Sequence, residues 1–157
     1  MLNRNREVNE RGVAHGGVAV LWKESRCTLA EVKLGVANFE NFEVLVTAGK
    51  MHRHTRKLVV VAYYLPPNYT KRRGQEALAH ISDVLVVVKH KYKDPYIFLA
   101  GDFNQWDIEE TLLDFADMKE VQVGLTRNGR CIDRIYSNIG RTITECGMLA
   151  PLETEDE

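Results

Sequence analysis

The stretch Tyr96-Ile-Phe-Leu-Ala-Gly-Asp-Phe-Asn104 decides the fold. It begins with five apolar residues, and a short apolar run of this kind predicts a buried strand. Because side chains alternate along a strand, we expect Asp102 and Asn104 on one face and Phe103 on the other. Gly101 would let the chain turn or let a substrate approach the backbone. A carboxylate and a carboxamide at a strand end can orient water and a hard cation, or they can simply hydrogen-bond their own turn.

The segments before this strand also follow the strand pattern. Residues 17–22, 27–32, 42–48 and 58–65 are short apolar runs rich in Val and Tyr, and they predict strands in an antiparallel meander. Pro66-Pro67-Asn68 then ends the last run. Apolar residues next recur with helical spacing, which predicts a helix over about 74–92 that ends in basic residues; they are Leu78, Ile81, Leu85 and Val88.

Behind the deciding stretch, an acidic capping sequence leads into a second amphipathic pattern. Asp107 with Glu110 precedes apolar residues on one helical face, and we expect a second helix over about 108–119, with Ile108, Leu112, Phe115 and Met118 facing inward. Asn128-Gly129 is a tight-turn signal, followed by strand-like runs at 131–136 and 142–148. Strands before, between and after two helices predict an α/β (α+β) layered domain rather than a strictly alternating one.

Composition limits the class of protein. The chain has 157 residues, of which 45% are hydrophobic and 27% charged, which is enough for one packed domain and excludes a disordered tail. No apolar run approaches the roughly 18 residues of a membrane span, and residues 1–11 lack a secretory signal, so we expect an intracellular protein without a membrane partner. Three widely spaced cysteines favour buried free thiols over a disulfide framework or a zinc site; they are Cys27, Cys131 and Cys146.

Charge is segregated along the chain. The formal net charge is −1, yet the last five residues hold four acids, so the remainder carries +3. Two basic clusters, at 50–57 and at Lys71-Arg72-Arg73, could each follow a phosphate backbone; solvated loop charge is the alternative.

Four segments in this order resemble the endonuclease/exonuclease/phosphatase superfamily, which includes the apurinic endonucleases, and are most similar to the endonuclease domains of non-LTR retrotransposons. The segments are Gly16-Gly-Val-Ala-Val-Leu-Trp-Lys23, Val61-Ala-Tyr-Tyr-Leu-Pro-Pro-Asn68, Ile97-Phe-Leu-Ala-Gly-Asp-Phe-Asn104 and Cys131-Ile-Asp-Arg-Ile-Tyr-Ser-Asn138. The resemblance implies a four-layer α/β sandwich of two mixed, mainly antiparallel sheets flanked by helices, and Mg²⁺- or Mn²⁺-dependent hydrolysis of a DNA phosphodiester.

The resemblance also implies roles for particular residues. Asp102 resembles the water-activating carboxylate and Asn104 the carboxamide beside it, and both would bind the metal. Tyr64 resembles the tyrosine that contacts the scissile phosphate, and Asp133 the acid that orients a histidine. Each has a structural alternative: a core aromatic for Tyr64, and a hairpin residue or a partner of Arg134 for Asp133. Asn68 and Thr126 resemble substrate-binding positions, Asn68 with a turn as its alternative, and the basic triplet Lys71, Arg72 and Arg73 joins them.

The family's metal-binding glutamate and its Ser-Asp-His strand have no match here, since only fifteen residues precede Gly16 and all five histidines precede Asp102. We therefore expect an incomplete domain over 13–150, with an N-terminal extension (1–12) and an acidic tail (151–157). Its nuclease activity would be impaired, and its uncovered sheet edges would favour self-association. The competing hypothesis is a non-catalytic remnant that binds nucleic acid or protein. A DNA substrate favours an intracellular, nuclear location.

Overall fold

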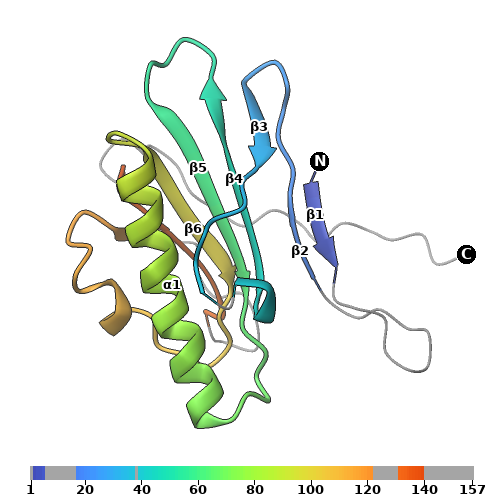
Figure 1. Cartoon of the computed structure of the whole chain (residues 1–157), viewed down its shortest axis with the longest axis vertical. Coiled ribbons are helices and arrows are strands. Elements are labelled where there is room, and N and C mark those ends of the chain that lie inside the picture. Colours follow the sequence, from blue (N-terminus) through green and yellow to red (C-terminus); the bar gives the residue numbers. More distant parts are fainter. Residues whose placement is uncertain (1, 6–16, 38, 122–130, 140–157) are drawn as a thin grey trace, which may run out of the picture.

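The computed structural model describes residues 2–5, 17–37, 39–121 and 131–139, and their ribbon is shown in Figure 1. One mixed sheet of six strands forms the centre, and a separate two-stranded sheet lies beside it. The strands are β1 (Leu2–Asn5), β2 (Gly17–Val20), β3 (Cys27–Glu31), β4 (Glu43–Met51), β5 (Lys57–Tyr64), β6 (Tyr96–Asp102), β7 (Lys119–Val121) and β8 (Asp133–Ser137). The helices are η1 (Phe39–Asn41), α1 (Lys71–Lys91) and η2 (Glu110–Leu112).

The order of strands in the large sheet is β3-β4-β5-β6-β8-β7. β3, β4 and β5 form the predicted antiparallel meander. β5 then pairs with β6 in parallel, with α1 as the connection between them, and β8 returns antiparallel to β6. The meander does not include β2, which pairs instead with β1, a segment whose sequence Leu-Asn-Arg-Asn carries no strand pattern.

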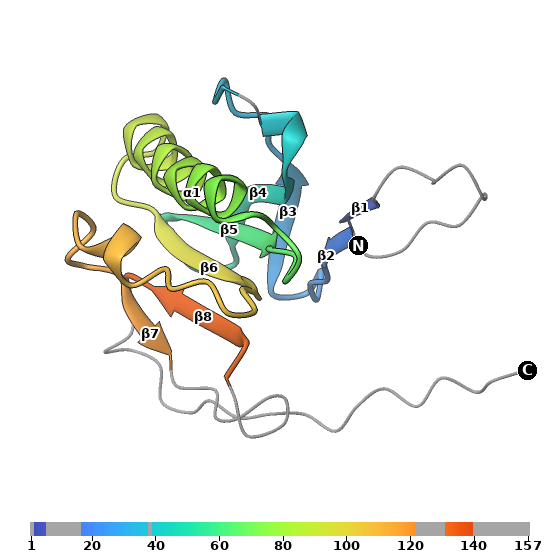
Figure 2. The same ribbon diagram turned by 90° about the horizontal axis from the view of Figure 1, so that it is seen from below.

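Helix α1 confirms the helical prediction and begins three residues earlier than expected. Thr70 caps it, since its hydroxyl accepts a hydrogen bond from the Arg73 backbone N–H. The helix lies across one face of the sheet (Figure 2), and its buried side chains include Ala77, Ile81, Val84, Leu85 and Val88. Leu78 is only half-buried, because the contact stripe is centred one residue away from the predicted one.

Two hydrophobic cores fill the two faces of the sheet. The first packs α1 against Val59, Val61, Ile97 and Leu99, all of them fully buried. The second, on the opposite face, packs β2 against Leu45 and Leu58 of the large sheet. The described residues thus form an α/β domain with one six-stranded sheet, a long helix on one face and a two-stranded sheet on the other.

The predicted second helix over 108–119 is wrong. Only η2 forms there, within a series of turns in which the backbone N–H groups of Phe115 and Met118 bond to the carbonyls three residues earlier. Ile108, Leu112, Phe115 and Met118 are nevertheless buried, as the pattern indicated. Their spacing of four, three and three also fits successive three-residue turns, and Asp107 bonds the Glu109 N–H locally instead of starting a regular helix.

Other expectations are corrected in detail. β7 forms where the end of that helix was predicted, and β8 begins two residues later than expected. Cys27 is a buried free thiol, but Cys131 is only half-buried. Cys146, the turn at Asn128-Gly129 and the strand at 142–148 lie outside the described residues. None of the described helices is long and apolar enough to cross a membrane.

Candidate functional site

Three of the predicted catalytic residues lie side by side across three neighbouring strands. In the sheet register Tyr64 of β5 is opposite Asp102 of β6, and Asp102 is opposite Asp133 of β8. Residues paired in this way project from the same face of a sheet. Alternation along β6 puts this row on the face away from α1, because Ile97 and Leu99 point into the helix-side core. Tyr64 and Asp102 are half-buried, whereas Asp133 is exposed.

Asn104 joins this row through a turn and not through strand alternation. β6 ends at Asp102, and Asn104 has a left-handed backbone with φ 48°. Its backbone N–H donates to Asp102 Oδ1 at 2.9 Å, which is the local turn bond that the sequence left as the alternative. Its side-chain Nδ2 donates to the Leu65 carbonyl, also at 2.9 Å, so the carboxamide is held beside the ends of both β5 and β6. Phe103 is fully buried on the helix side, as predicted.

The two loops at this end of the sheet are fastened to each other by consecutive side chains. After Asn104 has bonded Leu65, Gln105 Nε2 donates to the Pro67 carbonyl at 2.7 Å and Trp106 Nε1 to the Pro66 carbonyl at 3.2 Å. A backbone bond from Leu65 N–H to the Asp102 carbonyl, at 2.9 Å, adds to this set. The segment Pro66-Pro67-Asn68, which we call the Pro-Pro loop, is therefore fixed relative to Asp102. A site assembled from separate strands requires such fixing.

Trp106 also fixes the start of α1. A side chain at Gly74 would fall within 3.0 Å of three carbons of the indole ring, so the ring packs directly on the helix backbone. The sequence offered no sign of this contact, because a glycine inside a helical pattern often has no such role.

Two surface pockets flank the Pro-Pro loop and the loop after β6. One, of about 590 Å³, is lined by Asn104, Gln105 and Trp106 together with Glu109 and Arg134. The other, of about 610 Å³, is lined by Asn68, Thr70 and Arg72, with acidic side chains beside them. The predicted residues are thus divided between the row on the sheet face, Asn104 at its edge, and Asn68 with Arg72 across the Pro-Pro loop.

The basic triplet at the start of α1 does not act as one group. Arg73 is engaged by a neighbouring segment: its guanidinium donates to the Asn41 carbonyl at 2.5 Å and stacks on Phe42 at 4.3 Å from the ring centre. It also lies 3.4 Å from Glu76. Lys71 and Arg72 are exposed, and Arg72 also lies 3.5 Å from Glu76. Of the three cations, we therefore retain Lys71 and Arg72 as candidates for substrate phosphate.

Sequence reasoning missed Arg134 as a residue of this region. Its side chain donates to the Tyr136 hydroxyl at 3.2 Å and lies 3.7 Å from Glu109. The bond to Tyr136 raises the pKa of Arg134, and burial raises the pKa of the Tyr136 hydroxyl. Arg134 lies on the helix side of the sheet, as Tyr136 does two residues later in β8. The neighbouring residues Asp133 and Arg134 suggest a pair with each other in the sequence, but Arg134 lies near Glu109 instead. Thr126, a predicted substrate-binding residue, lies outside the described residues.

The donor set at the strand end fits a weakly held divalent cation. One carboxylate and one carboxamide oxygen are hard ligands, and Mg²⁺ commonly takes one or two carboxylates with water and substrate oxygens. Asp133 brings a second carboxylate to the same row. Within the described ranges, however, no three His, Cys, Asp or Glu side chains gather closely enough to hold a metal ion on their own. A cation here would depend on substrate or water for most of its ligands.

Comparison with known proteins bears on the family and the fold of the chain. Residues 3–153 match the model of the Endonuclease/Exonuclease/phosphatase family. No curated protein matches the chain. Among solved structures, the human Nocturnin catalytic domain with a bound sulfate anion superposes with a TM-score of 0.51 at 12% identity, over 74% of this chain and 49% of that one.

Two further structures resemble the chain more weakly. A humanized D. rerio TDP2 with 14 mutations gives a TM-score of 0.48 at 19% identity, over 78% of this chain and 53% of that one. A family protein from Bacteroides thetaiotaomicron gives 0.45 at 13% identity, over 60% and 41%. The chain spans about half the length of the first two structures.

Proposed function

Because the chain belongs to the Endonuclease/Exonuclease/phosphatase family, we propose that it is a metal-dependent phosphodiester hydrolase acting on DNA. The observation that carries this proposal is the register that aligns Tyr64, Asp102 and Asp133 on one face, with Asn104 held at the edge. Hydrolysis of a phosphodiester needs fixed groups that position water and stabilise the charge gathering on phosphate. This row brings two carboxylates and a phenol together, with a carboxamide at its edge.

Each side chain has a role that follows from its place. Asp102, at the centre of the row, accepts the proton of the attacking water, while Asn104 orients that water or a phosphate oxygen. The phenol of Tyr64 donates to the scissile phosphate from the next strand. Lys71 and Arg72, with Asn68, hold the flanking phosphates across the Pro-Pro loop, where Arg72 is exposed to solvent.

Mg²⁺ or Mn²⁺ would be held by Asp102 and Asn104, and when bound it neutralises the negative charge of the phosphate. Asp133 lies one strand away and its charge supports the same cation. This role differs from orienting a histidine, and none of the described histidines lies on β5, β6 or β8 beside the row.

DNA as substrate and a retroelement origin are supported by sequence. The spellings Tyr64-Leu-Pro-Pro-Asn68 and Ile132-Asp-Arg-Ile-Tyr-Ser-Asn138 are similar to those of retrotransposon endonuclease domains. We further propose that the β1–β2 pair belongs to the second sheet of a four-layer sandwich. Self-association would occur through the uncovered edges of the sheets, and the protein would act in the nucleus.

Supercoiled plasmid with Mg²⁺ tests the proposal. Asp102→Asn keeps the size of the side chain and its hydrogen bond from Asn104 but removes the negative charge. We expect it to lower the nicking rate by at least about a hundredfold, as expected for loss of a group that takes a proton in the transition state. Asp114→Asn, which neutralises an exposed acid away from the row, is the control and should retain the wild-type rate. Equal rates for wild type and Asp102→Asn would refute the assignment.

The alternative function is a non-catalytic module that binds nucleic acid or protein. It is favoured by one observation, that the described residues bring only two carboxylates and one carboxamide to the site. Under this alternative no preparation nicks DNA, yet duplex binding persists in Asp102→Asn and fails when Lys71 and Arg72 are changed to Gln. Nicking that depends on Asp102 would exclude it.

A further inference from the structure

The end of the molecule opposite the candidate site carries a surface that the proposed function does not use. It consists of residues 23–26, 50–57 and 90–95, which we call the basic pole. These are the turn before β3, the β4–β5 hairpin and the loop after α1, and the turn and the hairpin lie together at the top of Figure 1. The backbone N–H of His52 donates to the Arg26 carbonyl at 2.8 Å, which joins the hairpin to the turn before β3. Lys57 is the first residue of β5.

The basic pole concentrates positive charge. Its 18 residues contain eight Lys or Arg and two acids, Glu24 and Asp94, a formal charge of +6 in a chain whose total is −1. Arg56 lies 2.6 Å from Asp94, and this ion pair neutralises one cation and one acid, which leaves seven cations against Glu24 alone. Most of the cations are exposed; they include Arg26, Lys50, Arg53, Lys91 and Lys93.

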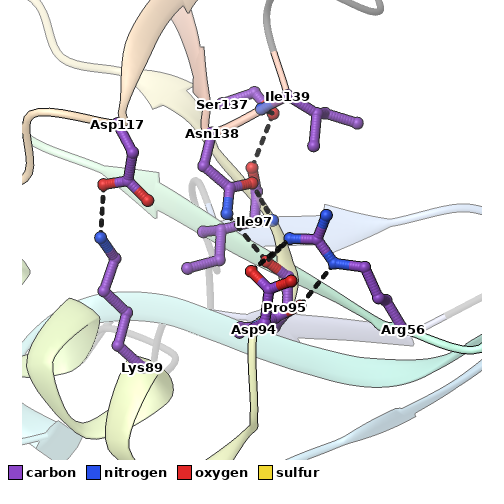
Figure 3. Close-up of polar contacts among 9 residues, drawn as sticks. All are labelled: Arg56, Lys89, Asp94, Pro95, Ile97, Asp117, Ser137, Asn138 and Ile139. Atoms are coloured by element: carbon purple, nitrogen blue, oxygen red, sulfur yellow. Dashed lines mark hydrogen bonds and ion pairs between the residues drawn. The ribbon is translucent and has the colours of Figure 1, made fainter.

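The structure ties the segments of the basic pole to one another. Arg56 Nε donates to the Asp94 carbonyl at 2.6 Å, and its Nη2 donates to the Asp94 carboxylate (Figure 3). The Arg56 guanidinium also stacks on Tyr96, at 4.1 Å from the ring centre. The contacts with Asp94 tie the hairpin to the loop after α1. Asn138 fastens the same loop from β8, since its Nδ2 donates to the Pro95 carbonyl at 2.8 Å. The separate cations are therefore presented together on linked elements.

We propose that the basic pole is a second binding surface for the phosphate backbone of double-stranded nucleic acid, separate from the cleavage site. Clustered Lys and Arg side chains bind phosphates by releasing condensed counterions, whatever the base sequence. β5 runs from the pole to Tyr64, and its eight residues span about 25 Å at about 3.3 Å per residue. A duplex repeats about every 34 Å, so one duplex could lie along the domain and contact both ends.

A lipid surface is the less favoured partner. Membrane binding by a polybasic surface is usually strengthened by apolar side chains that enter the interface. Of the described residues, the exposed large hydrophobic ones are Leu21, Val86 and Leu113, and none belongs to the basic pole. The hairpin tip carries His52, Arg53 and His54 instead.

Fluorescence anisotropy with a labelled DNA duplex of about 20 base pairs, in EDTA and across a KCl series, tests this inference. The pole variant combines Lys50→Gln with Lys93→Gln, one cation from the hairpin and one from the loop after α1. The matched control combines Lys33→Gln with Lys119→Gln, two exposed lysines outside both the pole and the candidate site. The two variants have the same net charge, so a difference between them reports position.

Each lost phosphate contact lowers the magnitude of the slope of log K against log[KCl] by about 0.9. We therefore expect the two substitutions of the pole variant to lower it by about 1.8. Wild type would then lose about twelvefold more affinity than this variant between about 50 and 200 mM KCl. The control should keep the wild-type slope. The assay is run in EDTA and measures binding without cleavage, so failure of the cleavage proposal would leave this result intact.

Three outcomes would overturn the inference: equal slopes in the pole and control variants, duplex binding without salt dependence, and no duplex binding at all. Sedimentation with phosphatidylserine-containing vesicles tests the other source of phosphate. Vesicle binding that depends on Lys50 and Lys93 without duplex binding would assign the surface to lipid and reject nucleic acid.

Discussion

Gly74→Ala tests the contact between α1 and the ring of Trp106, which lies in the loop after β6. In most helix interiors this change stabilises a protein, because alanine has the higher helix propensity by about 1 kcal/mol. Here the added methyl group would fall within 3.0 Å of three carbons of the Trp106 ring. Neither the helix backbone nor the ring can yield without cost, since Trp106 Nε1 also bonds the Pro66 carbonyl.

The net effect follows from these opposing contributions. Overpacking of a buried contact costs about 1–3 kcal/mol, and loss of the Trp106 hydrogen bond would add about 1 kcal/mol. Subtracting the helix gain of about 1 kcal/mol leaves a destabilisation of about 1–3 kcal/mol. For a protein of this size the melting temperature would fall by about 2–4 °C for each kcal/mol. The sign is therefore opposite to the usual one.

Urea unfolding followed by tryptophan fluorescence and far-UV circular dichroism measures the difference. Gly35→Ala is the control, because a Cβ at Gly35 meets no atom within 4 Å, and it should leave stability unchanged or slightly raised. If Gly74→Ala raised the unfolding midpoint as much as Gly35→Ala, Trp106 would not be packed on the helix as described. The plasmid-nicking rate of Gly74→Ala reports separately whether the shift reaches the Pro-Pro loop.

Three further predictions concern single side chains. Asn104→Gly accepts the left-handed backbone, so stability should change by less than about 1.5 kcal/mol while nicking is lost; unchanged nicking would remove Asn104 from the site. Arg56→Lys loses the two contacts that the guanidinium makes with Asp94, so calorimetry should show a melting temperature lower by about 2–4 °C. An unchanged melting temperature would mean that these contacts do not stabilise the fold. Burial lowers the pKa of His80 below 6.5, with Asp83 opposing this shift, so protonation favours the unfolded chain and stability should fall as pH drops through the range below 6.5. His80→Gln should flatten this pH dependence of the urea midpoint, and identical slopes would contradict the argument.

Much of the central sheet could be predicted because its strands carry their own signals. The Val- and Tyr-rich run of β5 and the apolar run of β6 identify themselves by composition, and α1 by its period of buried residues. β1 and β7 could not be found, because four and three residues of mixed polarity give no pattern and form strands only through their neighbours. The false helix after Asp107 has a different cause: its apolar spacing fits both a helix and consecutive turns, and spacing alone does not separate the two.

The candidate site could be predicted in its residue types but not in its assembly. Asp102 and Asn104 can be recognised in the sequence because they stand two residues apart at the end of an apolar run. The turn that joins them depends on the left-handed backbone of Asn104, which the sequence does not reveal. The basic triplet gave no indication that Arg73 would pack on Phe42, because the partner lies on a distant segment. Gly74 and Trp106 likewise appear unrelated in the sequence. Long-range contacts of this kind depend on the fold as a whole.

The register of β6 with β8 connects the site to its need for a cation. Asp102 and Asp133 are direct antiparallel partners, and side chains in such pairs have Cβ atoms about 5 Å apart. Like charges directly opposite one another destabilise a sheet, so the pairing has a cost unless positive charge is supplied. The basic pole lies about 25 Å away along β5, beyond the Debye length of about 8 Å at physiological salt, so its charge does not offset that of this pair. A divalent cation bound beside the two carboxylates would offset this like-charge cost, while the lysines of the basic pole would hold the backbone of the same substrate.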